Sequence, residues 1–261
     1  MLRIEHISKT FNPGTVNEKA ALRDFSLHVK PGDFVTIIGS NGAGKSTLFN
    51  AVCGSFLTDQ GRILLGGKDI TFMPEHRRSK QIGRLFQDPM RGTAPNMTIE
   101  ENLYLASGQG GSFSRIRKKE REMFRDRLAL LDMGLENRMN SKVGLLSGRQ
   151  RQALTLLMAT MVPPQLLLLD EHTAALDPCT ADKVLRLTKE IVEQSQITCM
   201  MVTHNMQQAL DLGNRTLMMA DGGIVLDIEG EERAGLCVDD LLTRFRVGTG
   251  KALDNDRILL G

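Results

Sequence analysis

Residues 34–50 read FVTIIGSNGAGKSTLFN, and this segment carries the strongest fold signal in the chain. It begins with an apolar run of strand length, continues through a glycine-rich turn and leads into a helix-like segment from residue 45. The turn fits G-x-x-x-x-G-K-[ST] from Gly39 to Ser46. Glycines let the backbone curl until its N–H groups point at phosphate oxygens, and the following helix presents the positive end of its dipole. The sequence therefore predicts a phosphate-binding loop in an α/β fold.

The residue types of this loop predict contacts to ATP. We expect Lys45 to neutralise the β- and γ-phosphates, Ser46 to offer its hydroxyl oxygen to Mg²⁺, and Thr47 to bond an α-phosphate oxygen. The alternative is a glycine-rich turn that merely starts a helix. The predicted nucleotide-binding residues of the loop are Gly39, Ser40, Asn41, Gly42, Ala43, Gly44, Lys45, Ser46 and Thr47.

A second strand, LLLLD at 166–170, places a carboxylate directly after four aliphatic residues. Ligands of open α/β sheets bind at the carboxyl ends of strands. We expect Asp170 to hold Mg²⁺ through water and Glu171 to orient or deprotonate the attacking water. Taken alone, a buried strand that ends in Asp-Glu is common; the upstream glycine-rich loop favours the functional interpretation.

The remaining chain alternates strand-like and helix-like segments, which predicts a largely parallel sheet covered by helices. Helix-like segments begin at 45, 180 and 205. Strand-like runs lie at 2–7, 33–39, 61–66, 82–87, 166–170, 197–204 and 215–221. From about 88 to 160 the strands stop, and SRIRKKEREMFRDRLALLDMGL has a helical period. We interpret this part as an inserted helical subdomain.

Composition excludes several classes of protein. The 261 residues are 41% hydrophobic, and 33 basic against 31 acidic side chains leave a net charge of +2, too small to argue for nucleic acid or a membrane surface. We expect no signal peptide and no membrane span, because the longest apolar runs are too short. Four scattered cysteines without a CxxC pair indicate neither a metal site nor a disulfide framework, and favour a reducing cytoplasm.

Further elements follow in a characteristic order: Gln87 at a strand end, LLSGRQ at 145–150, AALD at 174–177 and His204 at a strand end. With the two motifs above, residues 1 to about 230 resemble the ATP-binding subunit of a bacterial ABC transporter. The ordered set of six sequence elements is far more specific for this family than any one element alone. Taken singly, Gln87 is a polar strand end, His204 a helix cap and Asp177 a helix N-cap.

The resemblance implies a single ABC-type P-loop ATPase domain with N-terminal antiparallel β strands beside the mostly parallel sheet. Residues 1–87 and 161–230 would form the nucleotide-binding core, 88–160 the helical subdomain with the signature loop, and 231–261 a C-terminal tail. The tail includes an amphipathic stretch, DDLLTRF, that either packs on the sheet or extends a dimer contact.

The resemblance also assigns roles to single residues. Gln87 would sense the γ-phosphate and contact Mg²⁺, beside Ser46 and Asp170 as metal-binding residues. His204 would bond the γ-phosphate and fix the position of Glu171. Phe11 would stack on adenine, with an ordinary core phenylalanine as the alternative. The catalytic set is therefore Glu171, His204, Gln87 and Lys45, and Asp177 would contact the partner subunit.

The signature loop serves the opposite subunit in this family. In a head-to-tail dimer, Ser147, Gly148 and Gln150 would close over the ATP bound by the partner chain, most simply a second copy. Arg149 stands where the family normally has glycine. We expect impaired hydrolysis, because arginine holds the subunits apart or strains the backbone; the alternative is an arginine finger. A second departure is His172 in place of proline, which we expect only to alter the loop.

The implied function is to power a separate membrane permease from the cytoplasmic face of the membrane. DEHTAALDP and QDPMRGTAPNMT are similar to ATPases assigned to tryptophan/tyrosine uptake, which indicates import of a small solute such as an amino acid, with a substrate-binding protein as an indirect partner. An exporter motor remains an alternative, as does a soluble ATPase acting on nucleic acid or the ribosome. The basic cluster RIRKK at 115–119 is followed at once by EREMFRD, which favours a solvated helix face over nucleic-acid binding.

Overall fold

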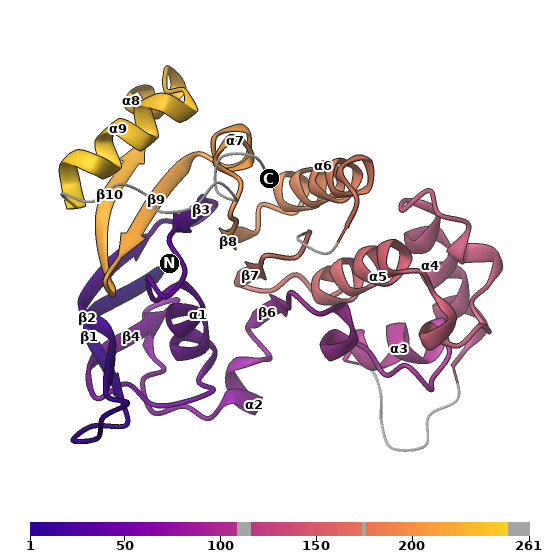
Figure 1. The fold of residues 1–261 in the computed structure, drawn as a ribbon. Coiled ribbons are helices and arrows are strands. Elements are labelled where there is room, and N and C mark those ends of the chain that lie inside the picture. Colours follow the sequence, from indigo (N-terminus) through magenta and orange to yellow (C-terminus); the bar gives the residue numbers. More distant parts are fainter. Residues whose placement is uncertain (109–115, 174–175, 250–261) are drawn as a thin grey trace. The chain divides into compact units, whose positions relative to one another are not determined.

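Two compact units make up the chain in this computed structural model, which describes residues 1–108, 116–173 and 176–249 (Figure 1). The first unit comprises Met1–Ile82, Gln165–Asp170 and Gln196–Gly261, and the second comprises Gly83–Pro164 and Glu171–Ser195. Residues 171–195 therefore group with the helical unit, although the expected core segment is 161–230. The physical reason is that helix α6 (Pro178–Gln194) packs against α5 (Gly148–Thr160).

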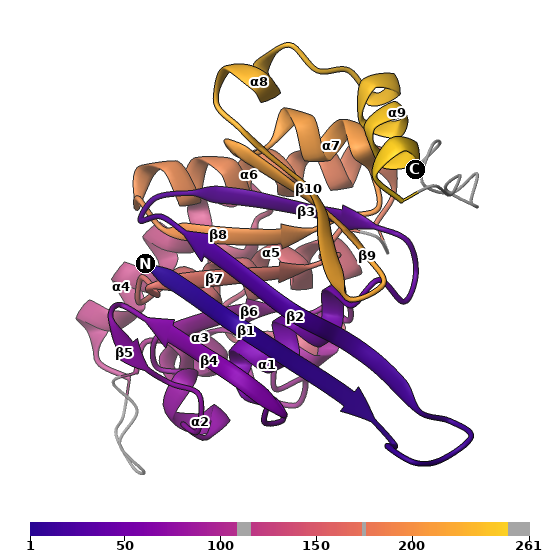
Figure 2. The same cartoon turned by 90° about the vertical axis from the view of Figure 1, so that its left-hand side faces the viewer.

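An antiparallel sheet forms one layer of the first unit (Figure 2). Its strand order is β2-β1-β4-β5, with bounds Lys19–Val29, Leu2–Phe11, Gln60–Leu65 and Lys68–Asp69. Leu2, Ile4 and Ile7 of β1 are buried, while Arg3 is exposed, as a sheet with one face on the core requires. The expected N-terminal antiparallel strands are confirmed.

A mixed, mostly parallel sheet forms the second layer of this unit. Its order here is β10-β9-β3-β8-β7, with bounds Gly223–Glu229, Arg215–Ala220, Phe34–Gly39, Thr198–Val202 and Leu166–Asp170. Strand β3 runs parallel to β8 and β9, β7 runs parallel to β8, and only β10 is antiparallel to its neighbour β9. Strand β6 (Ile82–Leu85) begins where the unit ends. The expected ABC-type P-loop fold is confirmed.

Helix α1 (Lys45–Cys53) connects the predicted loop to the core of the first unit. Its buried side chains Leu48, Phe49 and Val52 join one apolar cluster with side chains of both sheets. Gly44 before the helix and Gly54 after it have φ values of 102° and 80°, where a side chain would be strained. The loop is thus fixed between a buried strand and a buried helix.

The described part of the C-terminal tail packs on the first unit. Helices α8 (Glu231–Ala234) and α9 (Val238–Thr249) lie beside β10 in Figure 1, and Leu241 and Phe245 of α9 join a cluster with Ile228 of β10. The guanidinium of Arg233 donates to three carbonyl oxygens at the end of α7 (Met206–Asp211), those of Ala209, Leu210 and Leu212. Residues 250–261 of the expected tail lie outside the described residues.

The second unit is helical. Its longer helices are α3 (Ile99–Ala106), α4 (Lys118–Ala129), α5 and α6, and short 3₁₀ turns lie at Pro89–Gly92, Leu135–Asn137 and Val143–Leu145. Leu103, Phe124 and Leu154 are fully buried in its core. Within the part of the chain that the structure describes, no helix is long and apolar enough to cross a membrane.

A buried arginine holds the far end of α1. Arg78, the last residue of α2 (Glu75–Arg78), is only 1% exposed. Two of its four donated hydrogen bonds satisfy the last carbonyls of α1, where a positive charge also complements the helix dipole. The acceptors, at 2.7 to 2.9 Å, are the carbonyl oxygens of Ala51, Val52, Thr71 and Met73.

We expect Arg78→Met to lower the free energy of unfolding by about 3 kcal/mol, because three buried carbonyls and one partly buried carbonyl each lose a charged donor. Urea unfolding followed by circular dichroism measures this. The matched control is Arg77→Met, which changes the exposed neighbour on the same helix and should shift stability by less than about 0.5 kcal/mol. Equal unfolding midpoints for the two variants would contradict the role given to Arg78.

Candidate functional site

The glycine-rich loop lies at the carboxyl end of β3, with its backbone pressed against neighbouring strands. Gly39, Gly42 and Gly44 have φ values of 149°, 83° and 102°. A Cβ atom on Gly39 would lie 2.2 Å from the carbonyl oxygen of Met219, and one on Gly44 would lie 2.6 Å from that of Ala21. Only glycine fits these two positions, so the loop keeps the curled backbone that phosphate binding needs.

Lys45 folds back over this loop. Its ammonium donates hydrogen bonds to the carbonyl oxygens of Gly39, at 2.6 Å, and Ser40, at 3.0 Å, and the side chain is 5% exposed. Asn41, Gly42 and Ser46 are exposed on the loop and in the first turn of α1. The structure therefore gathers the predicted loop residues around one buried cation and the N-terminus of α1.

The carboxyl ends of three parallel strands meet at the same edge of the sheet. Asp170 of β7 is paired with Val202 of β8, which is in turn paired with Ile37 of β3. Thr203, one residue before the half-buried His204, donates its backbone N–H to the carbonyl oxygen of Ile37 at 3.1 Å. Asp170 and His204 thus lie at the edge from which the glycine-rich loop emerges, as predicted for ligands of parallel sheets.

Phe11 is half-buried and packs edge-to-face against Phe56, with ring centroids 5.3 Å apart. The ammonium of Lys9 lies 5.7 Å from the centroid of Phe11 and is held at 2.7 Å by Asp59. The proposed adenine contact of Phe11 stays a prediction. Its neighbour Phe56 is a residue that the sequence analysis missed, because no local pattern pairs two positions so far apart in the chain.

Two further predicted residues belong to the helical unit. Gln87 is exposed two residues beyond the end of β6 at Leu85, although it was expected to close that strand. Glu171 has a φ of 47°, in the left-handed region that residues other than glycine seldom adopt. Such backbone strain is concentrated at functional sites. The catalytic role of Glu171 stays a prediction.

The signature loop is a capped helix start. Ser147 is the N-cap of α5: its hydroxyl accepts from the backbone N–H of Gln150, and the Gln150 side chain accepts from the backbone N–H of Ser147, both at 3.3 Å. The Ser147 hydroxyl thereby keeps its own proton to donate. Gly148 opens the helix, and a Cβ atom there would meet no described atom within 4 Å beyond its chain neighbours and its own helix.

Arg149 is the second residue of α5 and is exposed. Its backbone is helical, and its φ angle is not among the positive values found in the described residues. The expected backbone strain is therefore wrong, because a helix start accepts any residue with a Cβ atom. Hindrance of the partner subunit remains a prediction.

Asp177 is the N-cap of α6, as expected, and accepts the backbone N–H of Thr180 at 3.1 Å. Hydrogen bonds from Thr180 hold the pKa of the Asp177 carboxyl below its usual range, with a smaller contribution from the charge of Arg149. Ala174 and Ala175 of the AALD motif lie outside the described residues.

His172 lies in the turn between β7 and α6, and its side chain is buried. It is 3% exposed, and its Nε2 lies 3.3 Å from the hydroxyl of Thr188 on α6. Burial lowers the pKa of the imidazole to about 4. The expectation that His172 only alters the loop stays a prediction, and the structure adds that its ring packs against α6.

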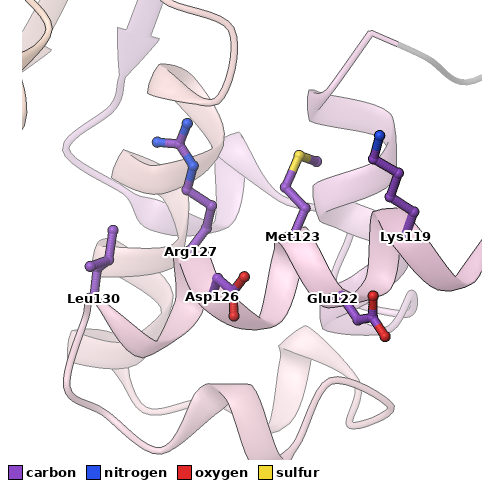
Figure 3. A pocket seen from close by; sticks show the side chains of 6 residues that line it. All are labelled: Lys119, Glu122, Met123, Asp126, Arg127 and Leu130. Atoms are coloured by element: carbon purple, nitrogen blue, oxygen red, sulfur yellow. The ribbon is translucent and has the colours of Figure 1, made fainter.

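A surface hollow along α4 is a separate feature. It is lined by Lys119, Glu122, Met123, Asp126, Arg127 and Leu130 (Figure 3). Charges of both signs surround it, and on the same helix Arg121 pairs with Glu100 at 2.7 Å. This agrees with the expected solvated helix face. None of the predicted site residues lines the hollow.

Sequence comparisons agree with this geometry. The pattern of the family described as ABC transporter matches residues 22–174. A tyrosine transport ATP-binding protein of Clostridioides difficile (strain R20291) is 40% identical over 247 residues, 94% of this chain and 98% of the relative. The phosphonates import ATP-binding protein PhnC of Alcaligenes faecalis is 34% identical over 233 residues, 87% and 82% of the two chains.

Solved structures show the same likeness. A dimeric post-hydrolysis state of the ATP-binding cassette MJ0796, bound to ADP and Pi, superposes with a TM-score of 0.76 at 27% identity and covers 88% of this chain and 98% of that chain. A nucleotide-free ATP-binding cassette from an ABC transporter gives a TM-score of 0.72 at 29% identity, covering 93% and 95%.

The buried imidazole of His172 predicts a loss of stability in acid. The unfolded state binds a proton near pH 6.5, whereas the folded state does so only near pH 4. Stability is therefore fully present above pH 6.5 and falls by about 3 kcal/mol as the pH drops to 4, where the loss levels off. We expect His172→Gln to show a smaller fall when urea unfolding is measured at pH 7, 6, 5 and 4. The exposed control His76→Gln should keep the full fall, and an unchanged fall in His172→Gln would refute the assignment.

Proposed function

The chain belongs to the ABC transporter family of ATPases, and we propose that it powers the import of an aromatic amino acid such as tyrosine. It is an ATP-binding protein whose hydrolysis of ATP is coupled to transport. The observation that carries the motor function is the shared sheet edge, where the glycine-rich loop, Asp170 and His204 come together. The import of an amino acid is supported by the 40% identity to a tyrosine transport protein over nearly the whole chain.

Hydrolysis is an in-line attack of water on the γ-phosphorus of ATP. Glu171 accepts a proton from the water as its oxygen bonds to phosphorus, and the bond to the bridging oxygen breaks to give ADP and phosphate. Lys45 leaves its carbonyl partners and neutralises the phosphate charge, while the N–H groups of the loop donate to phosphate oxygens. His204 and Gln87 contact the γ-phosphate.

The donor set fits Mg²⁺. The hydroxyl of Ser46 is exposed in the first turn of α1, and the carboxylate of Asp170 lies at the end of β7. Hard oxygen donors of this kind, together with phosphates, are the usual ligands of Mg²⁺, with Gln87 as a third contact. Ser46 and Asp170, with Gln87, would hold the ion, and the ion would neutralise negative charge on the phosphates.

Three partners follow from this function. A second copy of the chain places its Ser147, Gly148 and Gln150 over the ATP of the first, an arrangement supported by the dimeric cassettes of similar fold. A membrane permease carries the solute, and a substrate-binding protein delivers it. The chain then acts at the cytoplasmic face of the membrane. Relatives described as transport or import proteins favour this function over export and over a soluble role on nucleic acid or the ribosome.

Reconstitution tests the proposal. We expect the chain, assembled with its permease in proteoliposomes, to hydrolyse ATP faster when tyrosine-loaded binding protein is present, and to accumulate tyrosine. Glu171→Gln should lower hydrolysis about 100-fold or more while ATP still binds, because the general base is lost. Stimulation by a different solute, with none by tyrosine, would refute the amino-acid assignment but leave the motor intact. Undiminished hydrolysis in Glu171→Gln would refute the role of that carboxylate.

The signature loop gives a separate prediction. If Arg149 obstructs closure of the dimer, Arg149→Gly should hydrolyse ATP about tenfold faster, equal to about 1.4 kcal/mol in activation free energy. Arg149→Gln is the control that keeps bulk and removes charge, and it should stay slow. Steady-state ATPase rates with ATP-dependent dimerisation by light scattering decide this. A slower Arg149→Gly would instead support an arginine finger, and equal rates would remove any effect of Arg149.

A further inference from the structure

One cation beside the glycine-rich loop has no role in the function described so far. Lys19, the first residue of β2, is exposed, and among the described residues its ammonium makes no hydrogen bond or ion pair. The neighbouring Lys9 on β1 differs, because Asp59 neutralises it at 2.7 Å. A lysine side chain whose ammonium has no protein partner keeps all three of its N–H donors for a ligand.

The ammonium of Lys19 lies against the loop. Its Nζ is 3.4 Å from the point where a Cβ atom on Gly42 would stand. Gly42 has a φ of 83° and is itself exposed, so this part of the loop is open to a ligand on the side of Lys19. The positive charge therefore stands beside the backbone that is built to receive phosphate.

The strand that carries Lys19 is fixed to the loop by its backbone. Arg23, further along β2, donates its N–H to the carbonyl oxygen of Gly222 at 3.1 Å, and Gly222 donates its own N–H to that of Ala43 in the loop, also at 3.1 Å. The carbonyl oxygen of Ala21 fills the space beside Gly44. The position of Lys19 is thus set by rigid elements rather than by a free loop.

The register of the hairpin places Lys19 directly opposite Phe11. Directly paired residues of antiparallel strands carry their side chains on the same face, with Cβ atoms about 5 Å apart. Phe11 is the residue proposed to stack on adenine, and the loop at Gly42 is the proposed phosphate-binding loop. Lys19 is the residue that adjoins both.

We propose that Lys19 is a phosphate-binding residue of the nucleotide site, which donates to the phosphate chain of ADP and ATP where it passes from the base at Phe11 to the loop at Gly42. This inference rests on the proposed function and adds a second cation to Lys45. Because the contact is to phosphates that ADP and ATP share, Lys19 strengthens binding of both and takes no part in breaking the γ-phosphate bond.

Nucleotide binding by the full chain tests this. The variants are Lys19→Gln, which removes the charge at similar length, and Lys19→Arg, which restores it. The matched control is Lys68→Gln, which removes one exposed lysine from β5 of the same unit. Dissociation constants are measured by calorimetry for ADP, and by competition against fluorescent ADP for inorganic pyrophosphate. Thermal unfolding without nucleotide checks that each variant is folded.

We expect Lys19→Gln to bind both ADP and pyrophosphate about tenfold more weakly than the unchanged protein, since a hydrogen bond to a charged group is lost. Lys19→Arg should recover most of this loss, and Lys68→Gln should bind like the unchanged protein.

Two results overturn the inference alone. Equal affinities in Lys19→Gln and Lys68→Gln would show that the ammonium contacts no ligand, and weaker ADP binding with unchanged pyrophosphate binding would assign Lys19 to the nucleoside instead of the phosphates. No ADP binding by the unchanged protein would overturn the proposed function itself, and this inference with it. The two failures are therefore distinguishable.

Discussion

The close approach of the glycine-rich loop to its neighbouring strands is the constraint on which the first unit depends. At Gly39 and Gly44 the backbone passes so near the carbonyl oxygens of Met219 and Ala21 that no Cβ atom fits. These two carbonyls belong to different layers, β9 of the mixed sheet and β2 of the antiparallel sheet. The loop is thus clamped between the two layers, and its N–H groups are oriented before any ligand arrives.

Helix α1 connects the loop to the core of the first unit, and a charged side chain, Lys45 or Arg78, binds backbone carbonyls at each of its ends. At the loop end, the ammonium of Lys45 binds the carbonyls of Gly39 and Ser40. At the far end, the buried guanidinium of Arg78 binds the last carbonyls of the helix. A shift of the helix along its axis would break these charged hydrogen bonds, so they hold both ends of the helix in this structure.

The helical unit holds its own loop by different means. Ser147 and Gln150 cap α5 reciprocally, and the unit buries a core of leucine, phenylalanine and methionine side chains around that helix. Arg149 needs no special backbone there, because it follows the cap inside a regular helix. The predicted effect of Arg149 on hydrolysis therefore concerns its side chain and not its backbone.

Local signals in the sequence were enough to predict the α/β class, the loop at residues 39–47, the acidic strand end at Asp170 and the order of motifs, because glycine patterns, aliphatic runs and caps are local. They did not predict β2 or β10. KAALRD of β2 is composed largely of good helix formers, and GIVLDIE of β10 lies beyond the last recognised strand; both segments become strands because they pair with β1 and β9. The burial of His172, the contact of Phe56 with Phe11 and the place of Lys19 beside Gly42 are visible only in the folded chain. Each of these depends on residues brought together across the fold, and no local pattern encodes such distances.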